Sequence, residues 1–261
     1  MKPRYWRAVF AHEWRHSLAV RHFFSWFFLI GFPVLIVGLL PYTQRENPEP
    51  MEFLEWGAIV FVLIPGICCM LSLLLTAAPF LQAELEGRSW IYLSVRPGAR
   101  DALLLGKYLY SVSRTVLMAT ITLVICMAIG GFLGEFRYLL AMLVLILLGS
   151  LAYGAIYIFI GILIPRRAMV VAVIYSGLEF LLSLFPALIN RLTVQFRLRS
   201  LLIGWMDWEN SPDLDFFSSS GLFSEVPLWQ HVAVLLTMTA VLLFLAGLLL
   251  NRREYIAIRD E

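Results

Sequence analysis

Six long runs of apolar residues constrain this sequence more than any other feature. The hydrocarbon core of a bilayer is about 30 Å thick, so a helix of roughly 20 apolar residues crosses it. Runs of about this length lie at 23–41, 57–81, 114–133, 138–164, 168–189 and 228–250. Only 15% of the residues are charged, fewer than a soluble fold of this size needs to cover its surface. We therefore predict an all-α, polytopic membrane protein with six transmembrane helices, forming a single domain over residues 1–261.

The distribution of basic residues predicts the orientation of these spans. Six crossings place both chain ends on one side of the membrane, together with the connection 82–113 and the pair Arg166 and Arg167. Most of the 20 Lys and Arg residues fall in these segments, whereas the connection after the first span is acidic. Lys and Arg near span ends are retained in the cytoplasm. We therefore expect a multi-pass protein of a bacterial-type inner (cytoplasmic) membrane, with both termini cytoplasmic.

Residues 1–22 precede the first apolar run and follow a different pattern. Apolar residues recur there at every fourth position, which places them on one face of a helix: Trp6, Phe10, Trp14 and Leu18. Basic residues and histidines occupy the other positions. A helix with aromatics on one face and cations on another lies in the membrane interface. We predict an N-terminal amphipathic interfacial helix that meets the first span at a sharp angle, like an elbow.

The segment 12–16, HEWRH, matches the H-E-x-x-H pattern of zinc metalloproteases. His12 and His16 lie one helical turn apart and could grip a metal from one face, so an intramembrane zinc protease is one alternative. Catalytic zinc needs a third protein ligand, however, and no ligand motif facing this helix is apparent. The pattern also stands in a basic juxtamembrane stretch instead of a span. We interpret HEWRH as part of the interfacial helix and predict no metal site.

The connection 82–113 is the most informative polar segment, QAELEGRSWIYLSVRPGARDALLLGKYLYSVS. We expect the second span to continue as a helix into the cytoplasm. The Pro97-Gly98 dipeptide predicts a turn, and Asp101 is a candidate cap for a helix that re-enters the bilayer around Arg114. Two helices would then protrude beneath the membrane, joined by a compact aromatic and basic turn. Such a surface can dock a cytoplasmic subunit; the alternative is a solvated loop held near lipid head groups.

The stretch 84–107, ELEGRSWIYLSVRPGARDALLLGK, resembles the segment that follows the second span in permease subunits of type-2 ABC exporters. The entry AHEWRHSLAVRHFF (11–24) is similar to the elbow helix of the same family. In layout the resemblance covers the whole chain, from elbow helix to sixth span. It implies that a coupling element in contact with an ATPase lies at or near Glu84, Glu86, Arg88, Tyr92, Arg96, Pro97, Arg100 and Lys107.

The resemblance also implies ATP hydrolysis, for which this sequence has no nucleotide-binding motif of its own. An ABC exporter hydrolyses ATP, but the motif G-x-x-x-x-G-K-[ST] is absent, and Gly106-Lys107 is followed by Tyr108. Without that loop the chain has no cradle for nucleotide phosphates. The resemblance therefore implies a transport component that is not an enzyme and holds no cofactor, with ATP and Mg²⁺ bound by a separate ABC-type ATPase subunit. It further implies a second permease chain, identical or paralogous, and contact with membrane lipid but not with nucleic acid.

Glu179 is the one carboxylate well inside an apolar run. A charge at that depth is costly unless it is paired or protonated, which makes intramembrane carboxylates candidate sites. Three roles are open for Glu179: contact with the transported substrate, a hydrogen bond between helices, or a contact across a permease dimer. The glycines of GSLAYGAIYIFIG (149–161) favour close packing of helices.

The connection 190–227 is the longest segment outside the predicted spans. Its first part contains RLTVQFRLRSLLIGWMDW, which could lie along the outer leaflet with Trp205 and Trp208 at head-group depth. Its second part is acidic and contains Pro, Ser and Gly, a composition that predicts a loop. Three roles are open for this outer loop: it caps the exit, it receives an external accessory protein, or it is a solvated loop with neither role.

Two other classes of function are open on the sequence alone. A stand-alone secondary carrier or channel would also be a polytopic helical protein, but no inverted repeat is apparent and only Glu179 is available to couple ions. A membrane enzyme would need a convergent cluster of His, Asp or Ser, and none is apparent. We therefore expect the permease subunit of an ATP-driven exporter, and a copurifying ATPase would distinguish it from both alternatives.

Overall fold

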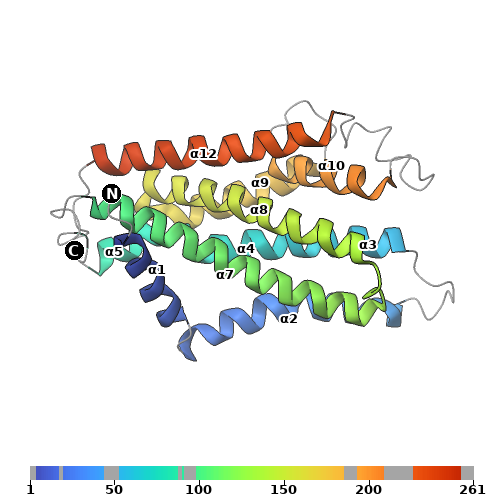
Figure 1. Cartoon of the computed structure of the whole chain (residues 1–261). Coiled ribbons are helices and arrows are strands. Elements are labelled where there is room, and N and C mark those ends of the chain that lie inside the picture. The colour runs from blue at the N-terminus through green and yellow to red at the C-terminus, as the bar shows by residue number, and fades with distance from the viewer. Residues whose placement is uncertain are drawn as a thin grey trace.

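The computed structural model describes residues 4–17, 20–43, 53–87, 90, 98–184, 193–208 and 226–253, and these residues form helices without a strand. The all-α prediction is confirmed, and Figure 1 shows the long helices running side by side along one axis. The elements are α1 (Arg4–Ser17), α2 (Val20–Thr43), α3 (Phe53–Phe61), the π-helix η2 (Val62–Cys68), α4 (Cys69–Thr76), α5 (Phe80–Glu86), α7 (Ala99–Gly130), α8 (Phe136–Leu163), the 3₁₀-helix η3 (Pro165–Arg167), α9 (Ala168–Leu184), α10 (Val194–Met206) and α12 (Leu228–Arg252).

Four stretches of helix are long and apolar enough to cross a membrane. The first predicted span lies in α2, whose described apolar part, Phe24–Leu40, is shorter than these four. The fifth lies in α9, which has 17 residues. The chain is therefore a polytopic helical membrane protein, and its total of six spans remains a prediction. The four candidate spans are Phe53–Glu86, Ala99–Gly130, Phe136–Leu163 and Leu228–Arg252.

The second predicted span is one helical rod with two local breaks. Pro65 lies inside the π-helix η2. A proline has no backbone N–H, so it cannot donate the hydrogen bond that an α-helix needs at this position, and the backbone forms a π-helix there instead. A turn then separates α4 from α5, and Pro79 is the N-cap residue of α5. Gly161 of α8 faces this turn, where an added Cβ would collide with the carbonyl oxygen of Ala78. The close packing predicted for the glycine-rich part of α8 is thus confirmed at the bend.

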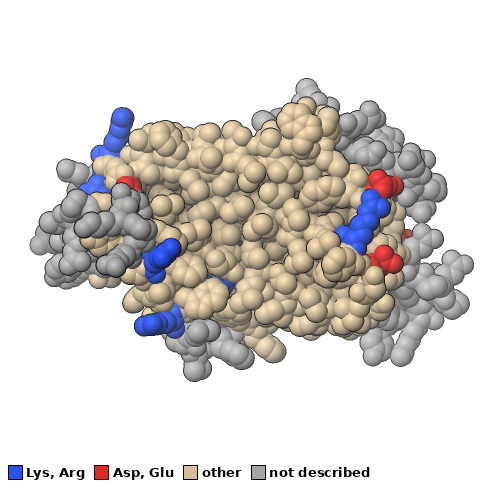
Figure 2. All heavy atoms as spheres, viewed as in Figure 1, with Lys and Arg blue, Asp and Glu red and all other residues tan. Residues whose placement is uncertain are grey.

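The surface of the bundle has charged ends and an apolar middle. Figure 2 shows Lys, Arg, Asp and Glu side chains gathered towards the two ends of the visible face, with uncharged residues between them. Large apolar side chains are exposed along α2, α9 and α12, for example Phe27 at 69%, Ile174 at 57% and Phe244 at 66%. Apolar patches of this extent on a protein surface indicate contact with lipid or with another protein. The pattern agrees with a bundle that spans a bilayer.

Helix α8 lies in the core of the bundle and packs against α4, α7, α10 and α12. Its tyrosines Tyr138, Tyr153 and Tyr157 are fully buried. Each hydroxyl has a partner on another element; that of Tyr138, for example, donates to the carbonyl oxygen of Gly57 at 2.8 Å. Buried phenol groups need such partners, so these tyrosines join α8 to its neighbours by specific contacts.

Helix α10 corrects the prediction for the first part of the outer connection. We expected this segment to lie along the outer leaflet, but α10 packs inside the bundle against α8, α9 and α12. The reason is that its apolar residues cover several faces instead of one, with Val194, Phe196, Leu198, Leu201 and Leu202 all buried. Trp208, which follows α10, also stacks on Tyr138 at 6.3 Å between ring centroids. The rest of the predicted outer loop, 209–225, lies outside the described residues.

Candidate functional site

Lys107 is the centre of a buried charge cluster that joins three helices. Its ammonium nitrogen lies 2.6 Å from Glu84 Oε1 on α5 and 3.4 Å from Glu13 Oε1 on α1. It also donates to the carbonyl oxygen of Phe80 at 3.5 Å. The side chain of Lys107 is only 10% exposed, and those of Glu84 and Glu13 are 16% and 25% exposed. Buried charges are costly unless they are paired, so this cluster holds α1, α5 and α7 in one arrangement.

The neighbouring Gly106 explains how α1 can approach α7 so closely. A Cβ at this position would lie 2.7 Å from Val9 Cβ and 3.0 Å from the carbonyl oxygen of Trp6. One turn further along each helix, the rings of Trp14 and Tyr110 meet edge to face at 6.3 Å. The apolar stripe predicted on residues 1–22 therefore packs partly against α7. Figure 1 shows α1 crossing α7 at an angle before the chain turns into α2.

Replacement of Gly106 by valine is expected to push α1 away from α7. Overpacking of a tight contact costs about 1–3 kcal/mol, because neither Val9 nor the Trp6 backbone can move far without disrupting α1. We expect a loss of this size in the free energy of unfolding in detergent. Gly247→Val is the matched control, since a Cβ at Gly247 meets nothing within 4 Å. Equal effects of the two substitutions would contradict this packing.

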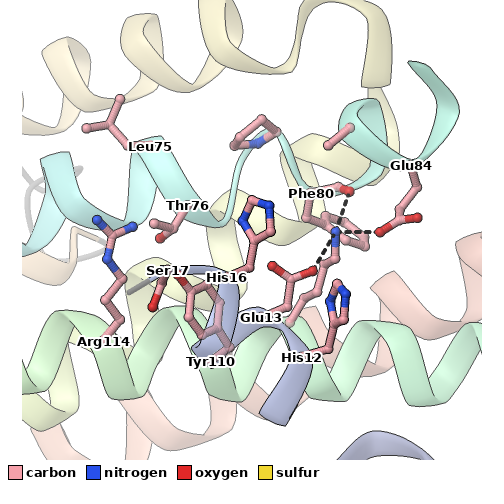
Figure 3. Close-up of a pocket in the computed structure, with 13 residues that line it drawn as sticks. His12, Glu13, His16, Ser17, Leu75, Thr76, Phe80, Glu84, Tyr110 and Arg114 are labelled. Atoms are coloured by element: carbon pink, nitrogen blue, oxygen red, sulfur yellow. Dashed lines mark hydrogen bonds and ion pairs between the residues drawn. The ribbon is translucent and has the colours of Figure 1, made fainter. Parts of the chain in front are cut away.

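A cavity of about 370 Å³ adjoins the charge cluster. Figure 3 shows Arg114 and Glu84 on opposite sides of the view, with His16 between them. The wall combines charged residues with aromatic and aliphatic ones. It is formed by His12, Glu13, His16, Ser17, Leu75, Thr76, Pro79, Phe80, Ala83, Glu84, Lys107, Tyr110 and Arg114.

A second set of contacts ties the start of α7 to the end of α12. Arg100 donates to the carbonyl oxygens of Leu250 and Asn251 at 3.2 and 3.1 Å, and its guanidinium carbon lies 5.5 Å from the ring centroid of Trp90. The last carbonyls of a helix lack partners within the helix, so Arg100 caps α12. Asp101 accepts a hydrogen bond from the Asn251 side chain at 2.8 Å. This contact fixes the same junction from the other side.

The prediction that Asp101 caps α7 is wrong. The N-cap residue is Gly98, with φ at +74°, and α7 begins at Ala99, so that Asp101 falls in the first turn. A left-handed conformation is open to glycine at little steric cost. Gly98 therefore ends the predicted turn, and the helix starts three residues earlier than it would with Asp101 as its cap.

The predicted coupling residues fall into separate groups. Glu84 and Lys107 meet in the charge cluster, whereas Arg100 contacts α12. Glu86 is exposed and accepts a hydrogen bond from Gln82 at 2.7 Å. Sequence reasoning missed Glu13 as a partner of Lys107, although Glu13 shares a helix face with Val9 one turn earlier. The other predicted members, Arg88, Tyr92, Arg96 and Pro97, lie outside the described residues.

Glu179 lies apart from this cluster, at the N-terminus of α10. Its carboxylate accepts hydrogen bonds from the backbone N–H groups of Val194 at 2.7 Å and Gln195 at 3.2 Å. The hydroxyls of Tyr175 and Tyr153 donate to it at 2.8 and 3.5 Å. Free N–H groups and the helix dipole make a helix N-terminus favourable for a carboxylate. These contacts match one of the three predicted roles of Glu179, the hydrogen bond between helices.

The HEWRH segment lies within α1. His12 and His16 are exposed and stacked, with 6.4 Å between ring centroids. Glu13, which would be the general base of a zinc protease, is instead paired with Lys107. Within the described part of the chain, no three His, Cys, Asp or Glu side chains are grouped closely enough to hold a metal ion. In α1, HEWRH thus contributes a carboxylate to the contact between helices.

A comparison with known protein families identifies the family of this chain. The family model described as ABC-2 family transporter protein matches residues 15–192, more than half of the chain. The chain belongs to the ABC-2 transporter family. The matched range of this ABC-2 transporter protein includes the whole stretch 84–107 and Glu179, whereas Glu13 lies just before it. No curated protein and no solved structure matches the chain. The resemblance to type-2 ABC permeases is therefore confirmed, and with it a role as the membrane component of a transporter.

Proposed function

We propose that this chain is the permease subunit of an ATP-driven ABC exporter and that a separate ATPase subunit docks on the connection between α5 and α7. In this proposal α2 and α9 complete a set of six spans, and α1 is the interfacial elbow helix. Both termini are cytoplasmic. Two permease chains, identical or paralogous, together form the pathway, and an external accessory protein can reach the outer segment 209–225.

The observation that carries this proposal is a rigid pair of helix ends that extends beyond the apolar spans. Helix α7 has 32 residues, about 48 Å, whereas the bilayer core is about 30 Å thick. The excess lies at its N-terminal end, where Lys107 ties it to α5 and Arg100 ties it to α12. A movement of the segment between α5 and α7 would therefore be transmitted to α1, α5 and α12 together. A transport subunit driven by a separate motor needs this kind of mechanical connection.

The position of the helix ends supports the orientation. Figure 1 shows α1, α5, the start of α7 and the end of α12 at the same end of the bundle. Arg166 and Arg167 lie in η3, which contacts α5. Basic residues concentrate at this end, and such residues are retained in the cytoplasm. The proposed ATPase therefore meets the end of the bundle that carries the coupling connection.

Charge reversal at Arg96 tests the docking. Arg96 is chosen over Arg100 because Arg100 caps α12, and its loss would disturb the bundle itself. Removal of a charged partner from an interface costs about 2–5 kcal/mol, so we expect Arg96→Glu to reduce the ATPase that copurifies with the tagged permease at least tenfold. The measurement is quantitative mass spectrometry of the affinity-purified complex.

Arg137→Glu is the matched control for this experiment. Arg137 pairs with Asp207 at the opposite end of the bundle, and both side chains are more than 60% exposed. Its reversal should leave the amount of ATPase unchanged. Both variants should unfold at the temperature of the wild type in detergent. A full complement of ATPase on Arg96→Glu would remove Arg96 from the docking surface.

A further inference from the structure

Arg114 is a buried cation at the membrane boundary of α7. The residue is 4% exposed, so its guanidinium does not reach water as a snorkelling side chain would. One terminal nitrogen donates to Ser25 Oγ at 2.7 Å, and the guanidinium carbon lies 5.5 Å from the ring centroid of Trp26. Its Nε is buried without a hydrogen-bond partner. The Nε–H group of Arg114 is therefore free to donate to a further acceptor inside the protein.

The charge of Arg114 has no acidic partner among the described residues. Lys107, two helical turns earlier on α7 and about 10 Å away along the axis, shows the contrast, because it is held by both Glu13 and Glu84. A buried ion that lacks a counter-charge is strongly unfavourable. An anion would complete the arrangement around Arg114, and none of the described residues supplies it.

The cavity beside Arg114 has room for such an anion. Figure 3 shows the guanidinium at one side of this space, with Thr76 and Ser17 near it, and the paired carboxylates at the other side. The cavity volume of about 370 Å³ lies within the usual range of ligand sites, about 300–1,000 Å³. The carboxylates in its wall are already engaged by Lys107, which leaves the end at Arg114 suited to negative charge.

The depth of the site indicates the kind of anion. From Arg114 to the end of α7 at Gly130 the helix rises about 24 Å, close to the hydrocarbon thickness of about 30 Å, so Arg114 lies near the hydrocarbon boundary, within reach of the lipid head groups. Trp26 lies against Arg114 itself, and Trp14 contacts Tyr110 one turn earlier on α7, as expected of aromatics near a membrane interface. Phosphate is the anionic group at this depth in every phospholipid. The planar donors of arginine match phosphate oxygens in geometry.

We propose that this cavity binds a phosphate group, with Arg114 as its charge partner, and that a membrane phospholipid supplies the group. The bound lipid then fills the space between α1, α4, α5 and α7. Arg114 is not among the residues proposed for ATPase docking, so the lipid site does not depend on the partner ATPase.

Native mass spectrometry of the full-length protein, extracted in mild detergent, tests this site. The wild type is expected to retain one phospholipid per chain, and Arg114→Gln to retain at least tenfold less because the charge-assisted hydrogen bonds are gone. Arg114→Lys keeps the positive charge but loses the planar pair of guanidinium donors, so it should retain an intermediate amount of phospholipid. Arg137→Gln, which removes an exposed cation at the other end, should bind lipid as the wild type does.

Thr76→Leu provides a second variant in case Arg114→Gln does not fold. It narrows the cavity near Arg114 without removing a charge, and it should also lose the lipid. Thermal unfolding with added inorganic phosphate distinguishes the two sources of the group, because a bound ligand raises the unfolding temperature. Stabilisation by phosphate together with no retained lipid would assign the site to a soluble phosphate. Lipid retention unchanged in both variants, or neither lipid nor phosphate bound by the wild type, would overturn the proposal.

Discussion

Replacement of Lys107 by methionine is expected to lower the free energy of unfolding by about 3 kcal/mol. The substitution leaves Glu13 and Glu84 close together and largely buried with no cation between them. Removal of one partner from a buried ion cluster costs about 3–5 kcal/mol, and the partial exposure of both carboxylates favours the lower end of this range. Denaturant unfolding in mixed micelles measures the loss. The same change should also loosen α1 from α5, while the packing of Val9 on Gly106 and of Trp14 on Tyr110 still holds α1 against α7.

Two controls separate the charge cluster from a general effect of substitution. In the triple variant Lys107→Met, Glu13→Gln, Glu84→Gln no charge is left unpaired, so most of the stability should return. Arg137→Met breaks an exposed ion pair, which contributes about 0–1 kcal/mol. If Lys107→Met were no more harmful than Arg137→Met, the cluster would not hold the three helices together.

Replacement of Glu179 by alanine is expected to cost about 3 kcal/mol of stability. The two backbone N–H groups at the start of α10 and the hydroxyls of Tyr175 and Tyr153 would lose their acceptor in a buried setting. Each unsatisfied buried donor costs about 1–3 kcal/mol, and partial rearrangement keeps the total below the sum. Unfolding in mixed micelles should show the loss, accompanied by easier proteolysis near α10.

Glu179→Gln distinguishes the structural role from the other two that the sequence allowed. Glutamine keeps one acceptor oxygen for the N-terminus of α10, so it should recover a substantial part of the stability and leave transport largely intact. A stable Glu179→Gln variant that has lost transport would instead support contact with the substrate. A stable variant that has lost its permease partner would support a dimer contact.

The predictable part of this fold was the part that depends on local composition. The runs at 57–81, 114–133, 138–164 and 228–250 were found because a bilayer demands about 20 apolar residues per helix, and each became a helix of sufficient length. The amphipathic stripe before the first span likewise gave α1. Helix α10 was misplaced, because its apolar residues cover several faces and are buried by contacts with the distant helices α8, α9 and α12.

The site was less predictable because it is built from distant residues. The resemblance marked both Glu84 and Lys107, but no local rule pairs residues 23 positions apart across a turn. Glu13 lies within the HEWRH pattern, which was weighed through its two histidines, and nothing in the pattern marked Glu13 as a partner for a lysine on α7. The resemblance placed Arg100 at or near the coupling element, and no local pattern indicated that it caps a helix 150 residues later. Contacts of this kind depend on the tertiary arrangement, which periodicity does not encode.

The central claim is that this chain provides the membrane passage while ATP is hydrolysed on another polypeptide. Its most direct test is transport into sealed vesicles that contain either the purified chain alone or the complex isolated through a tag on this chain. We predict ATP hydrolysis and ATP-dependent transport by the complex, which should contain an ABC-type ATPase in equal number to the permease chains, and neither activity from the chain alone. Solute movement by the chain alone, or a purified complex without any ATPase, would contradict the claim.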